Sequence, residues 1–235
     1  MPSSFQTTVA VPTLETERLR LRGHAMDDFP DCAAMWADPN VTRHIGGKPY
    51  TEEESWARFL RYFGHWLILG FGYWVAEDKA TGNFVGEVGF ADYKRSLHPF
   101  LKGVPEIGWA LVSQVQGRGF ATEAVRAVVA WGDEALPSPQ TACIIAPENL
   151  LSIRVAVKCG YRESQPATYK GRPTKLFIRD RNPSGGCDCR HPGYLPKSTS
   201  SNRTSLAFSC VPLALSGVSS VSCESSCANT RSAVF

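Results

Sequence analysis

The chain has 235 residues, of which 43% are hydrophobic and 11% aromatic, so it is long enough and apolar enough to build a packed core. Its net charge of +3 is too small for a typical nucleic-acid binder, which carries a basic stripe or patch. No apolar run reaches the roughly 18 residues of a membrane helix, and the N-terminus lacks the basic and apolar regions of a secretory signal. We therefore expect a cytoplasmic protein that binds neither nucleic acid nor membranes.

The composition changes sharply after Arg181. Residues 182–235 are rich in serine, carry few charges and show no lasting helical or strand period. This profile is typical of a disordered tail, and it also fits an aberrant C-terminus added to a finished domain. We therefore predict one domain over residues 14–181, with a flexible N-terminus over 1–13 and a tail over 182–235.

The eight cysteines are concentrated towards the C-terminus. Because a cytoplasmic chain keeps its thiols reduced, we predict no disulfide framework. Cys187, Cys189 and His191 have the residue types of metal ligands, but they lack the paired spacing of a zinc site. We therefore expect no bound metal.

The first 181 residues alternate between strand-like and helix-like patterns, which predicts an α/β fold. Thr51 followed by three glutamates is a strong helix start, and Gly160 is placed to end a helix. In chain order we predict a strand at 19–21, helices at 27–36 and 51–69, strands at 72–77, 84–93 and 106–112, a helix at 119–135, a strand at 141–146, a helix at 149–159, and a hairpin of strands 161–167 and 175–179.

The segment 109–123 combines a strand, a glycine loop and a helix. Gly117 and Gly119 allow positive φ and bring backbone amides close to a ligand, while the helix adds free N–H groups and a positive dipole end. This arrangement predicts an anion site sized for a phosphate or pyrophosphate, and the alternative is a tight strand-to-helix turn. A dinucleotide-binding loop is disfavoured because Thr122 stands where its third glycine belongs.

The loop resembles a family motif. Gln114-x-x-Gly117-x-Gly119, followed by A-T-E-A over 121–124, resembles the acetyl-coenzyme A (acetyl-CoA) pyrophosphate loop of the GNAT N-acetyltransferases. Residues 149–161, N-L-L-S-I-R-V-A-V-K-C-G-Y, are similar to the corresponding run of the RimJ/RimL-like branch of that family.

The opening L-E-T-E-R-L-R-L-R over 14–22 also resembles the first strand of that branch. The resemblance covers about residues 14–180. It implies a mixed, mostly antiparallel central sheet with helices on both faces.

The resemblance further implies acetyl-CoA as co-substrate and no metal. The residues that match the coenzyme-binding positions are Leu111, Val112, Gln114, Gln116, Gly117, Arg118, Gly119, Phe120, Ala121, Asn149, Ser152, Arg154 and Lys158. Backbone N–H groups near Leu111 and Val112 are the expected oxyanion donors. Asn149 either caps its helix or holds the pantetheine arm. Arg154 and Lys158 either contact the 3′-phosphate or form a solvated basic face.

The implied reaction is direct attack of an amine on the thioester. Ser152 matches the position of the thiolate proton donor, and its alternative role is helix capping. Glu106, ahead of the strand that precedes the loop, is the first candidate for the base, followed by Glu87 or by solvent alone. Tyr161 is expected to line the cleft, or else to pack against the last strand.

We therefore expect an N-acetyltransferase that acts on a primary amine, either a protein N-terminus or a small-molecule amine, as a monomer or homodimer. The alternative is a catalytically inactive CoA-binding sensor or structural module. The sequence does not identify the acceptor.

Overall fold

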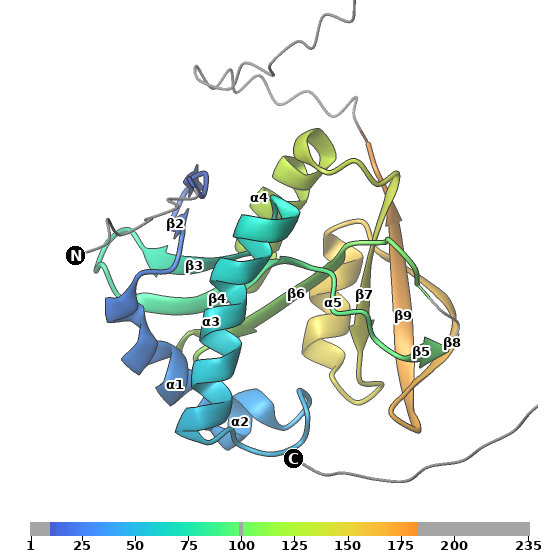
Figure 1. Ribbon diagram of the computed structural model, residues 1–235, viewed down its shortest axis with the longest axis horizontal. Helices are drawn as coiled ribbons and strands as arrows, with labels where there is room; N and C mark the ends of the chain where they lie inside the picture. Colours follow the sequence, from blue (N-terminus) through green and yellow to red (C-terminus); the bar gives the residue numbers. More distant parts are fainter. Residues whose placement is uncertain (1–9, 99–100, 183–235) are drawn as a thin grey trace, which may run out of the picture. The chain divides into compact units, whose positions relative to one another are not determined.

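The computed structural model describes residues 10–98 and 101–182 (Figure 1). The predicted flexible N-terminus up to residue 9 and the predicted tail from residue 183 lie outside the described residues, so both stay predictions. Over the described ranges, no helix combines the length and apolar character that a membrane span requires.

The regular elements follow the predicted order. The helices are α1 (Phe29–Ala37), α2 (Pro39–Thr42), α3 (Glu52–Leu69), α4 (Phe120–Ala135) and α5 (Leu150–Lys158), with short 3-10 turns at Met26–Asp28 and Ser113–Val115. The strands are β1 (Leu14–Glu15), β2 (Leu19–Arg22), β3 (Tyr73–Asp78), β4 (Phe84–Ala91), β5 (Leu97–His98), β6 (Glu106–Leu111), β7 (Gln140–Ile145), β8 (Arg162–Tyr169) and β9 (Arg172–Asp180). Three elements, α2, β1 and β5, were not predicted.

The predicted helix ends are visible as specific contacts. Thr51 and Glu54 form a reciprocal capping box at the start of α3, which satisfies two backbone N–H groups that the helix itself leaves free. Gly70 ends that helix in the left-handed region at φ 73°. Gly160, at φ 87°, follows α5 in the same conformation, as predicted.

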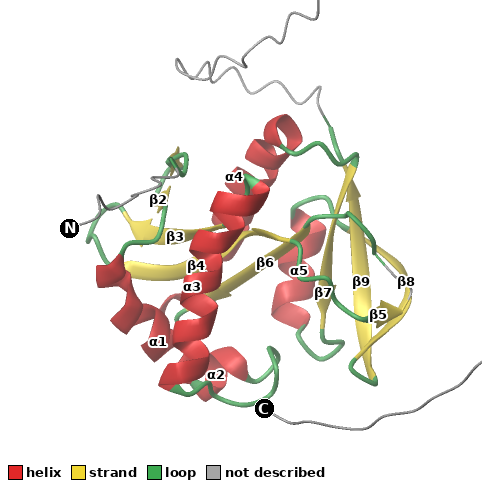
Figure 2. Ribbon diagram, in the orientation of Figure 1, coloured by secondary structure: helices red, strands yellow, loops and turns green. Residues whose placement is uncertain are grey.

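The strands form one mixed sheet in the order β1-β2-β3-β4-β6-β7-β9-β8-β5. Every neighbouring pair is antiparallel except β6 and β7, which are parallel. The register joins β6 to β7 only at Glu106 and Ala142, and Figure 2 shows the two strands running apart beyond that point. The mostly antiparallel sheet is therefore confirmed, and it is opened between its two parallel strands.

Helices cover both faces of the sheet. On β4, Val88 and Phe90 belong to the main core together with Val125 and Val128 of α4. Glu87, directly before Val88, bonds to side chains of α1 and α3 instead. Because neighbouring strand residues point to opposite faces, α4 lies on one face and α1 and α3 on the other (Figure 1).

Candidate active site

The divergence of β6 from β7 leaves one edge of β6 without a strand partner. Val112 N–H donates to Val85 of β4 at 3.1 Å, so Val112 faces the paired side. Backbone groups alternate sides along a strand, so the N–H and C=O groups of Trp109 and Leu111 face the open side. Of the two predicted oxyanion donors, the Leu111 N–H is therefore available to a ligand, whereas the Val112 N–H is already bonded to Val85.

The glycine loop lies directly beyond this open edge. Gly117 and Gly119 have φ of 78° and 87°, as the sequence predicts for a loop whose amides approach a ligand. Gln114, Gln116 and Arg118 are exposed beside them, and the Gln116 amide donates to the Leu111 carbonyl at 3.2 Å.

Gly119 is the N-cap of α4 and offers no side-chain cap. The N–H groups of Phe120, Ala121 and Thr122 accordingly have no hydrogen-bond partner within the described ranges. Three free donors and the positive end of a helix of 16 residues make this turn a suitable anion site.

A cavity of about 680 Å³ adjoins this turn, lined by Thr16, Glu17, Arg18, Gly119, Thr122, Glu123, Arg126, Ala127 and Lys158. The positively charged side chains that line the cavity differ in whether they pair with a carboxylate. Arg18 forms an ion pair with Glu123 at 2.6 Å, whereas Arg126 and Lys158 have no carboxylate partner among the described residues. Lys158 therefore offers a free charge beside the loop, while Arg154 is exposed and does not line the cavity.

At the start of α5, Asn149 caps the helix, which is one of the two roles predicted for it. Its side-chain oxygen accepts the N–H of Ser152 at 3.1 Å. The Asn149 amide nitrogen and the Ser152 hydroxyl have no protein partner within the described part of the chain. Both groups remain available to a ligand.

Glu106 stands where β6 and β7 separate, but it is not free. Both carboxylate oxygens accept from the Arg95 guanidinium, at 2.7 and 2.8 Å. Arg95 also donates to the hydroxyl of Tyr169 at 2.9 Å. Because each carboxylate oxygen has two acceptor positions, Glu106 can still accept one further bond on each oxygen.

Tyr161 is only 1% exposed, and its hydroxyl shares a 2.7 Å hydrogen bond with Thr141. Burial raises the pKa of this hydroxyl above its usual value. The position favours the packing alternative over the expected role at the cleft.

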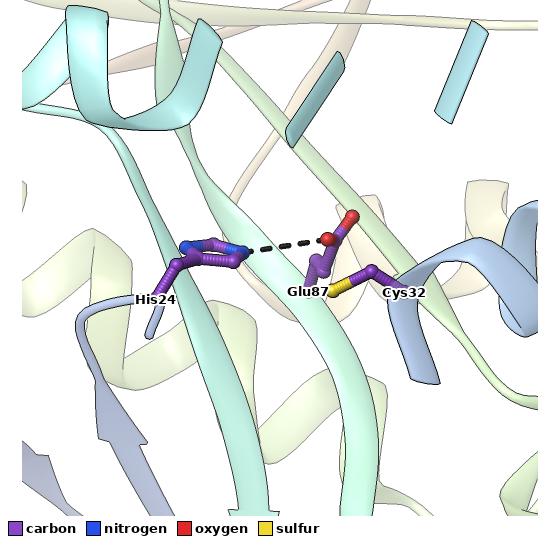
Figure 3. A group of neighbouring side chains, drawn as sticks. All are labelled: His24, Cys32 and Glu87. Carbon is purple, nitrogen blue, oxygen red and sulfur yellow. Dashed lines mark hydrogen bonds and ion pairs between the residues drawn. The ribbon is translucent and has the colours of Figure 1, made fainter. Parts of the chain in front are cut away.

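Glu87 lies in a buried polar cluster on the face covered by α1 and α3. One oxygen accepts from Trp36 at 2.9 Å and from the Tyr62 hydroxyl at 2.7 Å, and the other lies 3.3 Å from His24 Nε2 (Figure 3). Burial alone would raise the pKa of Glu87, but His24, Arg58 and Tyr62 outweigh it and hold the pKa below its usual value. A carboxylate this enclosed cannot contact an acceptor amine directly.

His24, Cys32 and Glu87 together offer nitrogen, sulfur and oxygen atoms within 4.8 Å of one another (Figure 3). A metal would need a thiolate, whereas burial and the neighbouring Glu87 strongly raise the pKa of the Cys32 thiol. His24 Nδ1 also has no partner in the described residues, while a metal-bound histidine normally donates its second N–H. These features favour a hydrogen-bonded cluster over a metal site.

The sequence analysis identified Glu87 but not its partners. The cluster joins a loop, two helices and a strand, and His24 and Glu87 are 63 positions apart in the chain, so no local pattern connects them. A polar residue inside the apolar strand 84–91 was the one available signal, because such a residue needs buried partners.

Comparison with known proteins places this geometry in a family. The family model described as an acetyltransferase (GNAT) domain matches residues 18–162. YkkB from Bacillus subtilis (strain 168) is 30% identical over 170 residues, which cover 71% of this chain and 94% of YkkB. The crystal structure of an acetyltransferase from Agrobacterium tumefaciens str. C58 is 29% identical, with a TM-score of 0.63 over 75% of this chain and 98% of that one.

A more distant structure has the same fold. Spermidine N-acetyltransferase from Vibrio cholerae, in complex with CoA and spermine, has a TM-score of 0.56 at 19% identity and covers 71% of this chain and 97% of that chain. The match of the family model over most of the sheet and the glycine loop decides the assignment: the chain belongs to the GNAT acetyltransferase family.

Proposed function

We propose that the protein is an N-acetyltransferase that moves an acetyl group from acetyl-CoA to a primary amine. The observation that carries this proposal is the open edge of β6 beside the glycine loop and the free first turn of α4. A strand-like arm, a thioester and a pyrophosphate can bind side by side along this path. The Vibrio cholerae spermidine N-acetyltransferase, which has the same fold, binds CoA.

The coenzyme would lie along this path in one direction. Its pyrophosphate would accept from the free N–H groups of residues 120–122 and lie against Gly117 and Gly119. Its pantetheine arm would pair with the open backbone edge of Trp109 and Leu111 as an added strand. Lys158 and the neighbouring Arg126 would attract the 3′-phosphate from the adjoining cavity.

The chemistry is addition followed by elimination. The amine nitrogen forms a bond to the acetyl carbon, and the carbonyl oxygen becomes an oxyanion that Leu111 N–H can stabilise. The carbon–sulfur bond then breaks, and the thiolate takes a proton from Ser152, which regains one from solvent, while the nitrogen releases its second proton to solvent as the amide forms. The proton of the incoming ammonium leaves through a water held by a free acceptor position of Glu106.

The decisive experiment follows thiol release from acetyl-CoA in the presence of a panel of amines. Isotopically labelled acetyl-CoA and mass spectrometry then identify the acetylated acceptor. Transfer to an amine supports the proposal. Tight CoA binding without transfer to any amine supports the inactive CoA-binding module instead, and binding of NADP in place of CoA by calorimetry contradicts both.

Two finer assignments belong to the same proposal. The run 149–161, with Asn149 and Ser152 oriented as described, supports the RimJ/RimL-like branch of the family. The cytoplasmic location and the state as monomer or homodimer stay predictions from the sequence.

A further inference from the structure

Arg58 of α3 lies on the face of the sheet opposite α4. Its guanidinium carbon is 3.7 Å from the ring centroid of Trp36, and its Nε donates to the Tyr62 hydroxyl at 2.7 Å. No carboxylate lies within 4 Å of Arg58 among the described residues, unlike Arg95 on the same face. The two terminal nitrogens of Arg58 have no hydrogen-bond partner in that part of the chain.

These contacts leave one edge of the guanidinium open. The Trp36 ring covers one flat face, and Tyr62 occupies the Nε corner. The remaining edge carries the two terminal nitrogens, whose parallel N–H bonds match the two oxygens of a carboxylate. Arg58 is half-buried, and its two terminal nitrogens are not among the enclosed side-chain atoms that lack a partner, so this edge is accessible to a ligand from solvent.

Arg58 is also close to the proposed reaction site. Trp36, on which it stacks, packs in one cluster with Ala110 of β6, and Val112 packs against the same cluster. Ala110 precedes Leu111, the proposed oxyanion donor. Because α4 and its free first turn lie on the other face of the sheet, an acceptor on the Arg58 face would reach β6 without meeting phosphates bound at that turn.

The two carboxylates that β4 and β6 present on this face are engaged by other protein groups. The carboxylate of Glu87 is enclosed by its cluster, and that of Glu106 is held by Arg95. In the β8–β9 hairpin, Lys170 and Arg172 have no carboxylate partner within the described ranges. Arg172 reaches towards the loop after α2, where its Nη1 lies 3.8 Å from the position of a β-carbon on Gly47.

We propose that Arg58 determines acceptor specificity by binding a carboxylate group of the amine substrate. This inference rests on the proposed acetyl transfer and names the acceptor class, an amine that also carries a carboxylate. Arg58 would hold that carboxylate in a two-bond pair and so direct the amine towards the thioester at Leu111.

The test compares acceptors that differ only in a carboxylate. The pairs are amino acids against their amides, and tetrapeptides that begin with Asp or Glu against those that begin with Asn or Gln. We expect the wild-type enzyme to favour the carboxylate member. Arg58→Gln should lose about tenfold or more in kcat/KM on that member, mainly through KM, and change little on the other. Arg58→Lys keeps the positive charge but cannot form the two parallel hydrogen bonds, so its kcat/KM on the carboxylate member should lie between those of the wild-type enzyme and Arg58→Gln.

Arg61→Gln is the matched control, because Arg61 is an exposed arginine one turn further along the same helix. It should keep the preference of the wild-type enzyme. Melting temperature and CoA affinity must be unchanged in each variant, which separates specificity from folding. A wild-type enzyme that acetylates only the uncharged members would overturn the inference, as would a folded Arg58→Gln enzyme with equal losses on both members.

Failure of the proposed function has a different signature. If the wild-type protein acetylates no amine of the panel, the same carboxylates are titrated by calorimetry in the presence of CoA. Binding to the wild-type protein and its loss in Arg58→Gln would still support a carboxylate site. Absence of binding to the wild-type protein would reject the site as well.

Discussion

Glu106 lies in the guanidinium fork of Arg95, with oxygen–nitrogen distances of 2.7 and 2.8 Å, at the point where β6 and β7 separate. The carboxylate that the sequence suggests as a base is therefore fixed in orientation and partly occupied. Its free acceptor positions allow it to hold a water, and a base acting through a water needs such a fixed position.

Glu106→Gln tests this role, since it keeps the shape of the side chain and removes the base. We predict a lower kcat at neutral pH and partial recovery at high pH, where more of the acceptor amine is already unprotonated. Steady-state rates across pH provide the measurement.

Glu163→Gln is the control, because it removes another carboxylate that bonds a cation, Lys175, on the exposed part of β8. It should leave the pH profile unchanged. A Glu106→Gln enzyme with the wild-type rate and profile would remove Glu106 from the mechanism. Glu87 is too enclosed to replace it by direct contact, so solvent would then accept the proton.

Ser152→Ala separates chemistry from helix capping. The cap of α5 runs from the Asn149 side chain to the Ser152 backbone N–H, so loss of the Ser152 hydroxyl leaves the cap intact. We predict a lower kcat, an unchanged melting temperature and little change in CoA affinity, because the hydroxyl acts as charge develops on sulfur.

Asn149→Ala provides the contrast. It removes the cap and should lower the free energy of unfolding by about 1 kcal/mol, while Asn149→Asp should restore it. Equal losses of stability in Ser152→Ala and Asn149→Ala would show that Ser152 is structural.

Gly119→Glu tests the coenzyme site. The substitution adds a negative charge at the free first turn of α4 and a side chain at φ 87°, where the pyrophosphate is proposed to bind. We predict at least about tenfold weaker CoA binding by calorimetry, about 1.4 kcal/mol. Gly82→Glu is matched to it, because Gly82 has φ 73° in the turn between β3 and β4 with no neighbouring atom within 4 Å of its β-carbon position. Wild-type affinity in a folded Gly119→Glu protein would refute the assignment.

Local signals account for the parts of the fold that the sequence predicts well. The capping box of Thr51 and Glu54 and the glycine after α5 act within a few residues, so the pattern itself reports them. The strands β1 and β5 have two residues each, which is too short for any period to be visible. Helix α2 did carry a signal, since Asp38 followed by proline is a typical helix start, and Asp38 caps it in the structure.

The candidate site likewise has features that local sequence sets and features that depend on how distant elements pack. The glycine loop is contiguous in the chain, and its positive φ values follow from its residue types. The fork of Arg95 on Glu106 and the stacking of Arg58 on Trp36 join residues from different elements, so their pairing depends on how the sheet and helices pack. The occupied N–H of Val112 also follows from the register of β4 and β6, which no local pattern sets.

Removal of residues 182–235 tests the predicted domain boundary. The last strand, β9, ends at Asp180, and the composition changes directly after it. We predict that the truncated protein keeps the melting temperature and the rate of acetyl transfer of the full chain. A large fall in melting temperature would assign the segment to the fold, and a loss of rate alone would connect it with acceptor binding.

Glu87→Gln tests whether the buried cluster stabilises the fold through its charge. The pKa of Glu87 lies below the usual 4.5 in the folded protein, so the folded state binds fewer protons there than the unfolded state. Its contribution to stability is therefore present above the usual pKa and is lost as the pH falls through the lower, folded pKa. Because the variant leaves His24 without its carboxylate and removes a buried charge that Arg58 stabilises from a distance, we predict a loss of about 3 kcal/mol in the free energy of unfolding at pH 7.

The difference between the wild-type protein and Glu87→Gln should shrink as the pH is lowered from about 5, because protonation of the wild-type carboxyl removes the same charge. Urea unfolding at a series of pH values measures it, with Glu163→Gln as an exposed control that should change the free energy of unfolding by less than about 1 kcal/mol. A Glu87→Gln protein as stable as wild type at pH 7 would show that the cluster contributes through packing alone. A loss that does not vary with pH would instead point to the geometry of the hydrogen bonds from Trp36 and Tyr62 rather than to the charge.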